Sequence, residues 1–413
     1  MRSKIIVLGL IILIILSIFI VVLAYNAATW LTGWKYRKSV IITQTVGAGV
    51  DYQIKLTIFY TNGTDGNSQI YLGGKSQMDF DDVRFTTTAD ALLSYWCQTY
   101  TDGVNATFWV KVSESLSESD AKIFVYYGNE DAVSLSNQVA TFVDVIDDVV
   151  LALPMDEGQG TTTFDYSGNG FNGAIEGASW TEGEYSKALS FDGVDDYVNT
   201  SSISLSLLAS SFTFAAWIKP SYDLPDPPYA SLPIVANFPY IGISIAAIEL
   251  DEFDVKGWMD GYSSNYNSKQ TWGSWHHVVV VYKGLGSSER ELYVDGVLVG
   301  TDAVGTAGNF TGLVRIGNPD YVAQPSSVID EVHIYNQTLT STQISNSYNN
   351  YGDPAIEAGK VLVRELVDPE PTQGATGLQQ DQENSRPNPL IIALPLLFSM
   401  ILAVYLFMRK RRH

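Results

Sequence analysis

The chain has 413 residues, a formal net charge of −21 and an apolar fraction of 46%. This length predicts two domains with appended segments, because one domain usually takes about 100–200 residues, and the acidic charge excludes a nucleic-acid partner, whose phosphates need a basic protein face. A single cysteine, Cys97, excludes an intrachain disulfide and a zinc site built from several thiolates, and the presence of only four histidines excludes most His-based catalysis and His-rich metal sites.

An apolar run, Ile5–Ala24, follows two basic residues near the start of the chain. As a helix, a run of this length would span about 30 Å, which matches the hydrocarbon core of a bilayer. The run is longer than the usual apolar core of a signal peptide, about 7–15 residues, but small residues at its end offer a cleavage site. Residues 1–28 are therefore either a cleaved signal peptide or an uncleaved signal anchor.

Residues 29–146 form a first block rich in Val, Ile, Phe, Tyr and Trp. Its apolar residues alternate with polar ones, and clusters of Gly, Asn, Asp and Ser separate the runs, which is the pattern of an antiparallel β-sandwich. The expected strands include Ser39–Thr43, Tyr52–Phe59, Thr107–Val112 and Lys122–Tyr127.

Residues 147–351 repeat this pattern in a second, larger block. Strands are expected at Phe212–Lys219, His276–Lys283 and Val328–Tyr335, and Asp295-Gly296 lies between two short apolar pairs. Asp-Gly in that position is a strong hairpin signal, because both turn residues need a positive φ. The sequence therefore predicts an all-β protein with two antiparallel β-sandwich domains, flanked by membrane helices.

The composition changes after the second block. Residues 352–389 are rich in Glu, Gln, Pro, Gly and Asp, and we expect them to form an acidic disordered stalk, since they lack the apolar content that offsets chain entropy. A second apolar run, Leu390–Met408, predicts a transmembrane helix, and 409–413 form a basic tail. Basic residues stay on the cytoplasmic side, so 29–389 should be extracellular on a cell-membrane protein with one or two membrane passes.

The expected extracellular region carries N-x-[ST] sequons, the acceptor sites for N-glycosylation. On a translocated chain we expect glycosylation at one or more of them. They begin at Asn62, Asn105, Asn199, Asn309 and Asn336.

A series of motifs follows in order along the second block: Leu151–Gly160, Asp165–Gly170, Ala188–Gly193, Asp196–Val198, Phe212–Ile218, Trp275–Val278, Leu292–Gly296, Ile329–Val332 and Tyr335-Asn336. In order and spacing they resemble the laminin-G-like (concanavalin-A-like) jelly-roll family. The resemblance implies two packed antiparallel sheets, frequently a calcium ion, and binding of carbohydrate or protein ligands.

The first block carries motifs of its own: Gly33–Arg37, Phe80–Phe85, Tyr95-Trp96, Phe108–Lys111 and Tyr126–Asn129. Over 30–143 they resemble an uncharacterised prokaryotic surface-protein family that commonly precedes laminin-G-like modules. This second resemblance implies no activity.

A candidate calcium loop runs from Asp165 to Glu176. Oxygen-bearing side chains occupy its positions 1, 3, 5 and 12 with Gly at position 6, and calcium needs six to eight oxygen ligands around a sharp turn. The laminin-G-like resemblance implies that this loop meets Asp330, so the expected ligands are Asp165, Asn169 and Asp330. The alternative is a turn that binds nothing, since Asp, Asn and Gly are common turn residues.

Two further acidic groups have plainer interpretations. Asp192, Asp195 and Asp196 are interpreted as a solvated hairpin tip rather than a second cation site. Glu249 and Asp251 would share one face of a strand, as a retaining glycosidase requires, but the third acid, Asp254, is one methylene shorter than the Glu of such enzymes. We therefore expect a protein that is not an enzyme.

Aromatic residues gather in the Ser/Asn/Gly-rich stretch Gly257–Gly273. Exposed rings can stack on the apolar C–H faces of sugars, so Trp258, Tyr262, Tyr266 and Trp272 are the candidate ligand-binding residues. The alternative is that these rings anchor the loop to the sandwich.

The sequence as a whole predicts a membrane-anchored cell-surface recognition protein that binds carbohydrate or an envelope protein, with calcium as its candidate cofactor. The main alternative is a non-enzymatic structural or assembly component of the cell envelope. A glycoside hydrolase is the third.

Overall fold

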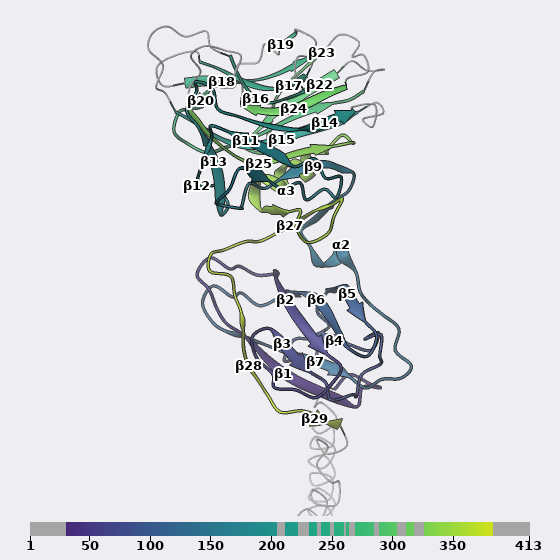
Figure 1. The fold of residues 1–413 in the computed structure, drawn as a ribbon. Coiled ribbons are helices and arrows are strands. Elements are labelled where there is room, and N and C mark those ends of the chain that lie inside the picture. The colour runs from purple at the N-terminus through teal and green to yellow at the C-terminus, as the bar shows by residue number, and fades with distance from the viewer. Residues whose placement is uncertain are drawn as a thin grey trace, which may run out of the picture. The chain divides into compact units, whose positions relative to one another are not determined.

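The computed structural model describes residues 30–204, 211–221, 231–237, 241–247, 252–259, 262–263, 269–284, 289–303, 311–317 and 326–382. The chain folds into two compact units (Figure 1). Unit 1 contains the described residues up to Thr141 together with those from Val367 onward, and unit 2 runs from Phe142 to Leu366.

Unit 1 is a β-sandwich of two mainly antiparallel sheets (Figure 1). Its core consists of residues that alternate inward along the strands, such as Ile54, Leu56 and Ile58 on β2. One sheet has the order β28-β1-β7-β4, with β29 also pairing to β1, and the other has the order β3-β2-β6-β5. The strands are β1 (Tyr36–Ile42), β2 (Tyr52–Phe59), β3 (Gln69–Tyr71), β4 (Arg84–Thr86), β5 (Tyr95–Thr101), β6 (Asn105–Val112), β7 (Ala121–Tyr127), β28 (Gln373–Thr376) and β29 (Gln380–Asp381), with a short helix α2 (Gln138–Thr141).

Unit 2 has two large antiparallel sheets, which we name the front and back sheets. The front sheet has the order β10-β11-β14-β24-β16-β17-β18-β19, with β20 on β18. Its strands are β10 (Thr162–Thr163), β11 (Gly173–Glu176), β14 (Tyr197–Ser204), β16 (Ser231–Asn237), β17 (Ile241–Ala247), β18 (Glu252–Met259), β19 (Tyr262–Ser263), β20 (Gln270–Thr271) and β24 (Thr311–Gly317).

The back sheet has the order β12-β13-β25-β15-β21-β22-β23, with β9 on β25. Its strands are β9 (Val149–Leu153), β12 (Ser179–Glu182), β13 (Lys187–Phe191), β15 (Phe212–Pro220), β21 (His276–Tyr282), β22 (Glu289–Val294), β23 (Val297–Ala303) and β25 (Ser327–Tyr335). The expected hairpin joins β22 to β23, with φ of +51° at Asp295 and +75° at Gly296. The prediction of this turn is confirmed.

The main core of unit 2 draws residues from both large sheets, and a second core covers the outer face of the back sheet. Ala216 and Val278 belong to the main core, whereas their strand neighbours Ala215 and Val279 belong to the second. The layer over this outer face consists of helix α3 (Ser341–Asn349) and a small sheet of β8 (Asp144–Ile146), β26 (Tyr351–Asp353) and β27 (Val361–Arg364). Ile344 of α3 and Val363 of β27 are fully buried in the second core.

The structure differs from the expected acidic stalk over 352–389. The described part, up to residue 382, carries the end of β26 and strands β27, β28 and β29. Residues 361–364 are buried in unit 2, and Thr376 and Asp381 pair with β1. Composition suggested disorder because the segment has few apolar residues, but three of those few lie together in β27, and edge pairing needs only backbone groups. Residues 383–389 lie outside the described residues.

The domain limits also differ from the expected ones. The boundary lies between Thr141 and Phe142 rather than at 146, and unit 2 continues to Leu366 rather than ending at 351. No helix long and apolar enough to span a bilayer occurs in the part of the chain that the structure describes. Both apolar runs, 5–24 and 390–408, lie outside that part.

Candidate functional site

The outer face of the front sheet presents a cluster of polar and aromatic side chains on β14 and β24. Val198, Val314 and Ile316 are fully buried on the inner face. Their strand neighbours therefore point outward, and Tyr197 and Arg315 are among them, each half-buried. This side of the sheet differs in chemistry from the apolar side.

Three outward side chains, Tyr197, Asn199 and Arg315, hold one another in place, and we name them the front-face triad. Asn199 lies directly opposite Arg315 in the antiparallel register, and the Arg315 Nε donates to the Asn199 Oδ1 at 2.9 Å. The guanidinium carbon lies 5.4 Å from the ring centroid of Tyr197, within the range of a cation–π contact. The triad thus fixes a ring, an amide and a cation side by side on adjacent strands.

An acidic turn, 192–196, precedes the triad and joins β13 to β14. The carboxylates of Asp192, Asp195 and Asp196 lie within 4.8 Å of one another, and the backbone N–H of Asp192 donates to Asp196 Oδ2 at 2.8 Å. Burial raises the pKa of Asp196, and the charges of the other two carboxylates raise it further. Asp192 and Asp195 are exposed as predicted, but the predicted hairpin is wrong, because β13 belongs to the back sheet and β14 to the front sheet, so the turn crosses between the sheets. The structure adds that all three carboxylates converge.

Two glycines make room for this turn. Gly177 has a φ of +79°, and a Cβ there would lie 2.0 Å from Asp196 Oδ1. A Cβ on Gly317 would lie 2.7 Å from the backbone oxygen of Asp196. The close approach requires glycine at both positions.

The predicted calcium loop is tied to β9 by hydrogen bonds. The Asp165 Oδ1 accepts the N–H groups of Ala152 at 3.0 Å and Ser167 at 2.9 Å, and its Oδ2 accepts the N–H of Phe171 at 2.9 Å. The Asn169 side-chain amide donates to a β9 carbonyl at 3.0 Å. In this geometry Asp165 holds backbone amides in the way that a side chain caps a turn.

The third expected calcium ligand, Asp330, is fully buried on β25. Its Oδ2 accepts the N–H groups of Glu184 at 3.0 Å and Tyr185 at 3.2 Å, and its Oδ1 accepts the N–H of Glu331 at 2.9 Å. Burial raises the pKa of Asp330 well above its ordinary value. Asp165 accepts two hydrogen bonds at each oxygen, so a cation there would have to displace one of the donors, whereas Asp330 Oδ1 accepts a single N–H and keeps a second lone pair. Calcium at this site stays a prediction.

The candidate aromatic residues fall in a part of the chain that is only partly described. Trp272 packs on Phe253 with ring centroids 4.9 Å apart and lies against the main core, as the anchoring alternative expects. Trp258 lies on β18 and Tyr262 on β19, but their side chains lie outside the described structure, as does the whole of Tyr266.

The other candidate residues are placed as follows. Asn62 is exposed, Asn105 and Asn199 are half-buried on strands, and the Asn336 Oδ1 is buried with no hydrogen-bond partner. Asn309, Glu249 and Asp251 lie outside the described residues. Asp254 accepts the backbone N–H of Lys269 at 3.2 Å. Among the four sequons that the structure describes, Asn62 has the only exposed side chain.

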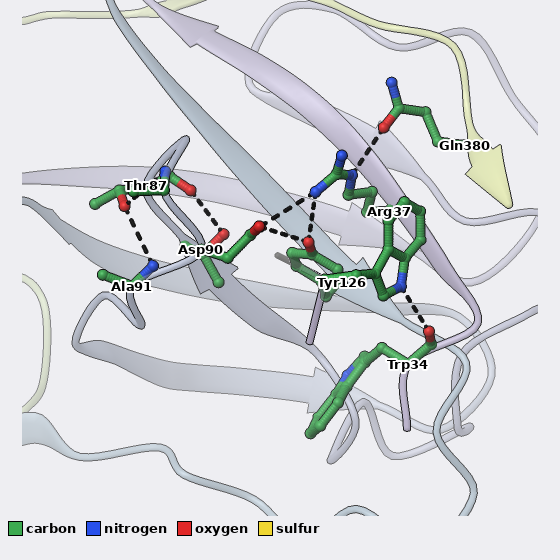
Figure 2. Close-up of polar contacts among 10 residues, drawn as sticks. Trp34, Arg37, Thr87, Asp90, Ala91, Tyr126 and Gln380 are labelled. Atoms are coloured by element: carbon green, nitrogen blue, oxygen red, sulfur yellow. Dashed lines mark hydrogen bonds and ion pairs between the residues drawn. The ribbon is translucent and has the colours of Figure 1, made fainter. Parts of the chain in front are cut away.

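Unit 1 contains a dense polar network centred on Arg37 (Figure 2). The Arg37 Nη1 donates to Asp90 at 3.2 Å and to the Tyr126 hydroxyl at 2.6 Å, and its Nε donates to Gln380 at 2.7 Å. The guanidinium carbon lies 4.2 Å from the ring centroid of Trp30, which precedes β1 in the chain. Every partner belongs to unit 1, so this network joins its β1, β7 and β29 rather than offering an open site.

The family comparisons agree with both resemblances. Residues 192–345 match the concanavalin A-like lectin/glucanases superfamily, in its laminin-G form. The second domain is laminin-G-like. Residues 79–182 match a domain of unknown function, DUF2341, and this match continues past Thr141 into unit 2. No curated protein matches the chain.

Solved structures similar to the chain match about half of it. Domain 4 of AbnA, a GH43 extracellular arabinanase from Geobacillus stearothermophilus in complex with arabinotriose, is 19% identical, with 49% of this chain and 98% of that chain covered and a TM-score of 0.37. The binding domain of Paraclostridial Mosquitocidal Protein 1 is 15% identical, with 49% and 52% covered and a TM-score of 0.37. The botulinum neurotoxin serotype D binding domain is 14% identical, with 49% and 52% covered and a TM-score of 0.38. The match thus spans about half the length of the last two chains.

Proposed function

We propose that this protein is a membrane-anchored cell-surface recognition protein whose laminin-G-like domain binds carbohydrate on the outer face of its front sheet. The observation that carries the proposal is the front-face triad, in which Arg315 holds Asn199 and Tyr197 in fixed positions. A sugar offers apolar C–H groups to a ring and hydroxyl groups to an amide and a guanidinium. Because the triad is pre-ordered, little side-chain entropy is lost on binding.

Calcium is proposed as an assisting ion for this domain. Calcium prefers oxygen ligands, and carboxylates are its strongest protein ligands. The acidic turn brings three carboxylates together beside Tyr197, whereas Asp165 and Asp330 accept backbone N–H groups. If an ion contributes to sugar binding, the acidic turn is the better placed of the two sites.

A glycan array probed with the full-length protein tests the proposal. We expect binding to a restricted set of glycans, reduced at least tenfold in Arg315→Ala and Tyr197→Ala. Tyr100→Ala, which removes an exposed ring from unit 1, is the matched control and should bind as the wild type does. A blank array would support the alternative of a structural or assembly component, and release of reducing sugar from a polysaccharide would support the hydrolase.

The anchoring part of the proposal rests on the two apolar runs and on their basic flanks. With both flanks cytoplasmic, the two domains face the exterior. A protease added to intact cells should therefore digest the domains. Digestion only after lysis would contradict the extracellular placement.

A further inference from the structure

A small cavity lies beneath α3 and β27, against the outer face of the back sheet. It has a volume of about 20 Å³ and is lined mainly by aromatic and aliphatic side chains. Besides tyrosines, the ionisable residues that line it are His277, Glu331 and His333. This volume has room for about one water molecule or ion. All the lining residues belong to unit 2.

The three ionisable side chains are buried and lack hydrogen bonds of good geometry at the atoms that could bind a ligand. His277, Glu331 and His333 are 5%, 4% and 6% exposed. Both Glu331 carboxylate oxygens, the His277 Nδ1 and the His333 Nε2 are buried with no hydrogen bond of good geometry, although the Tyr351 hydroxyl interacts with the Glu331 carboxylate. Such groups cost free energy unless something satisfies them. Four such atoms around one cavity are a set that a single bound ion or water could satisfy.

The backbone places the Glu331 side chain there at a cost. Ala215 pairs with His333 and Trp217 pairs with Asp330, so Glu331 and Val332 together face a single residue of β15. This is a β-bulge, and Glu331 has a φ of +50°, which is strained for a residue with a side chain. The bulge puts the strain at the residue whose carboxylate lacks a hydrogen bond of good geometry.

The spacing of two of these atoms fits a shared metal ion. Glu331 Oε2 and His333 Nε2 are 3.5 Å apart, which is too long for a good hydrogen bond. Two ligand atoms bound to one tetrahedral zinc at about 2.1 Å each lie about 3.4 Å apart. A metal ion between them would satisfy both atoms at normal bond lengths.

We propose that Glu331 and His333 bind a divalent transition-metal ion of the zinc class in this cavity, with His277 or a cavity water completing the coordination. Among the described residues, the only three ligand atoms of His, Cys, Asp or Glu within 4.8 Å of one another are those of the acidic turn. His277 must therefore move toward the ion to bind it, or a water molecule takes that coordination position. Imidazole and carboxylate ligands suit zinc and its neighbours better than they suit calcium.

Metal binding by the full-length protein, purified without a polyhistidine tag, tests this proposal. After removal of metals with a chelator, we expect one equivalent of Zn²⁺ to bind per chain at the cavity. Two single variants test the ligands. Glu331→Gln, which keeps the side-chain shape, and His333→Gln should each weaken Zn²⁺ binding at least tenfold. His276→Gln is the matched control, because His276 is also buried but bonds Asp295 and the Thr271 carbonyl through its two ring nitrogens.

Co²⁺ gives a second readout that does not depend on how stable the variants are. Bound to the wild-type protein in four or five coordination, Co²⁺ should show strong visible absorption bands, and these should be absent in Glu331→Gln. Weak bands typical of octahedral Co²⁺, unchanged zinc affinity in His333→Gln, or an equal loss in His276→Gln would each overturn the proposal.

Discussion

The two large sheets of the laminin-G-like domain differ in what covers their outer faces. Over the back sheet, Ile344 and Val363 of the added layer are fully buried against its outer side chains. On the front sheet, the outward Tyr197 and Arg315 remain half-exposed. The chain thus uses one outer face to build a further core, and on the other it leaves these two side chains half-exposed, where we propose that recognition takes place. The predictions below test this division of roles.

The largest effect is expected from weakening the layer over the back sheet. Ile344→Ala leaves a cavity in the second core and should lower the free energy of unfolding by about 2–5 kcal/mol, whereas Ile344→Val should cost about 0.5–1.5 kcal/mol. Because the chain has two units, hydrogen exchange of the β21 and β25 amides gives a local measure. Unchanged exchange in Ile344→Ala would show that the layer contributes little.

A second effect distinguishes the two acidic sites of the domain. Asp165→Asn replaces an oxygen that accepts the Phe171 N–H with a group that can be a donor, and should cost about 1–3 kcal/mol. If Asp165 only holds amides, the melting temperature should fall equally with calcium and with chelator. A loss seen only with calcium would restore Asp165 as a calcium ligand. Asp195→Asn, in the acidic turn, should lose any calcium-dependent rise in melting temperature.

Most of the fold could be predicted from the sequence because the local alternation of apolar and polar residues indicates each strand. The alternation in Phe212–Lys219 and Val328–Tyr335 predicted β15 and β25, and Asp295-Gly296 predicted the hairpin between β22 and β23. The pairing of Thr376 with Val40 could not be predicted, because two edge strands far apart in sequence pair through backbone groups that any residue carries. Composition described this segment correctly as polar but could not show its partner.

The candidate site was harder to predict, since it depends on residues brought together across the sheets. Asn199 was noticed only as a sequon, and its contact with Arg315 joins residues 116 positions apart. His277 and His333 are buried on β21 and β25, and the bulge that places Glu331 beside His333 has no signal in the strand alternation.

A smaller effect should follow from filling the space beside the acidic turn. Gly177→Ala forces a side chain into a φ of +79° and against Asp196, which should cost about 1–2 kcal/mol for the backbone alone. We expect reduced glycan binding together with this loss of stability, because the turn leads directly into Tyr197. Gly160→Ala also has a positive φ, but a Cβ there meets nothing within 4 Å, so it controls for backbone strain. Equal glycan binding by the two variants would separate the turn from the recognition face.

The smallest expected effect is a pH dependence at the acidic turn. Burial and the neighbouring carboxylates raise the pKa of Asp196 above its ordinary value of 3.8, so the folded state binds more protons than the unfolded state between these two values. The contribution of Asp196 to the free energy of unfolding therefore falls as the pH rises through that interval and is largest below it. With a chelator present, Asp196→Asn should reduce the pH dependence of the free energy of unfolding in this interval. Asp147→Asn, elsewhere on unit 2, should leave that pH dependence unchanged. An unaltered slope in Asp196→Asn would show that the three carboxylates do not repel one another enough to attract a cation.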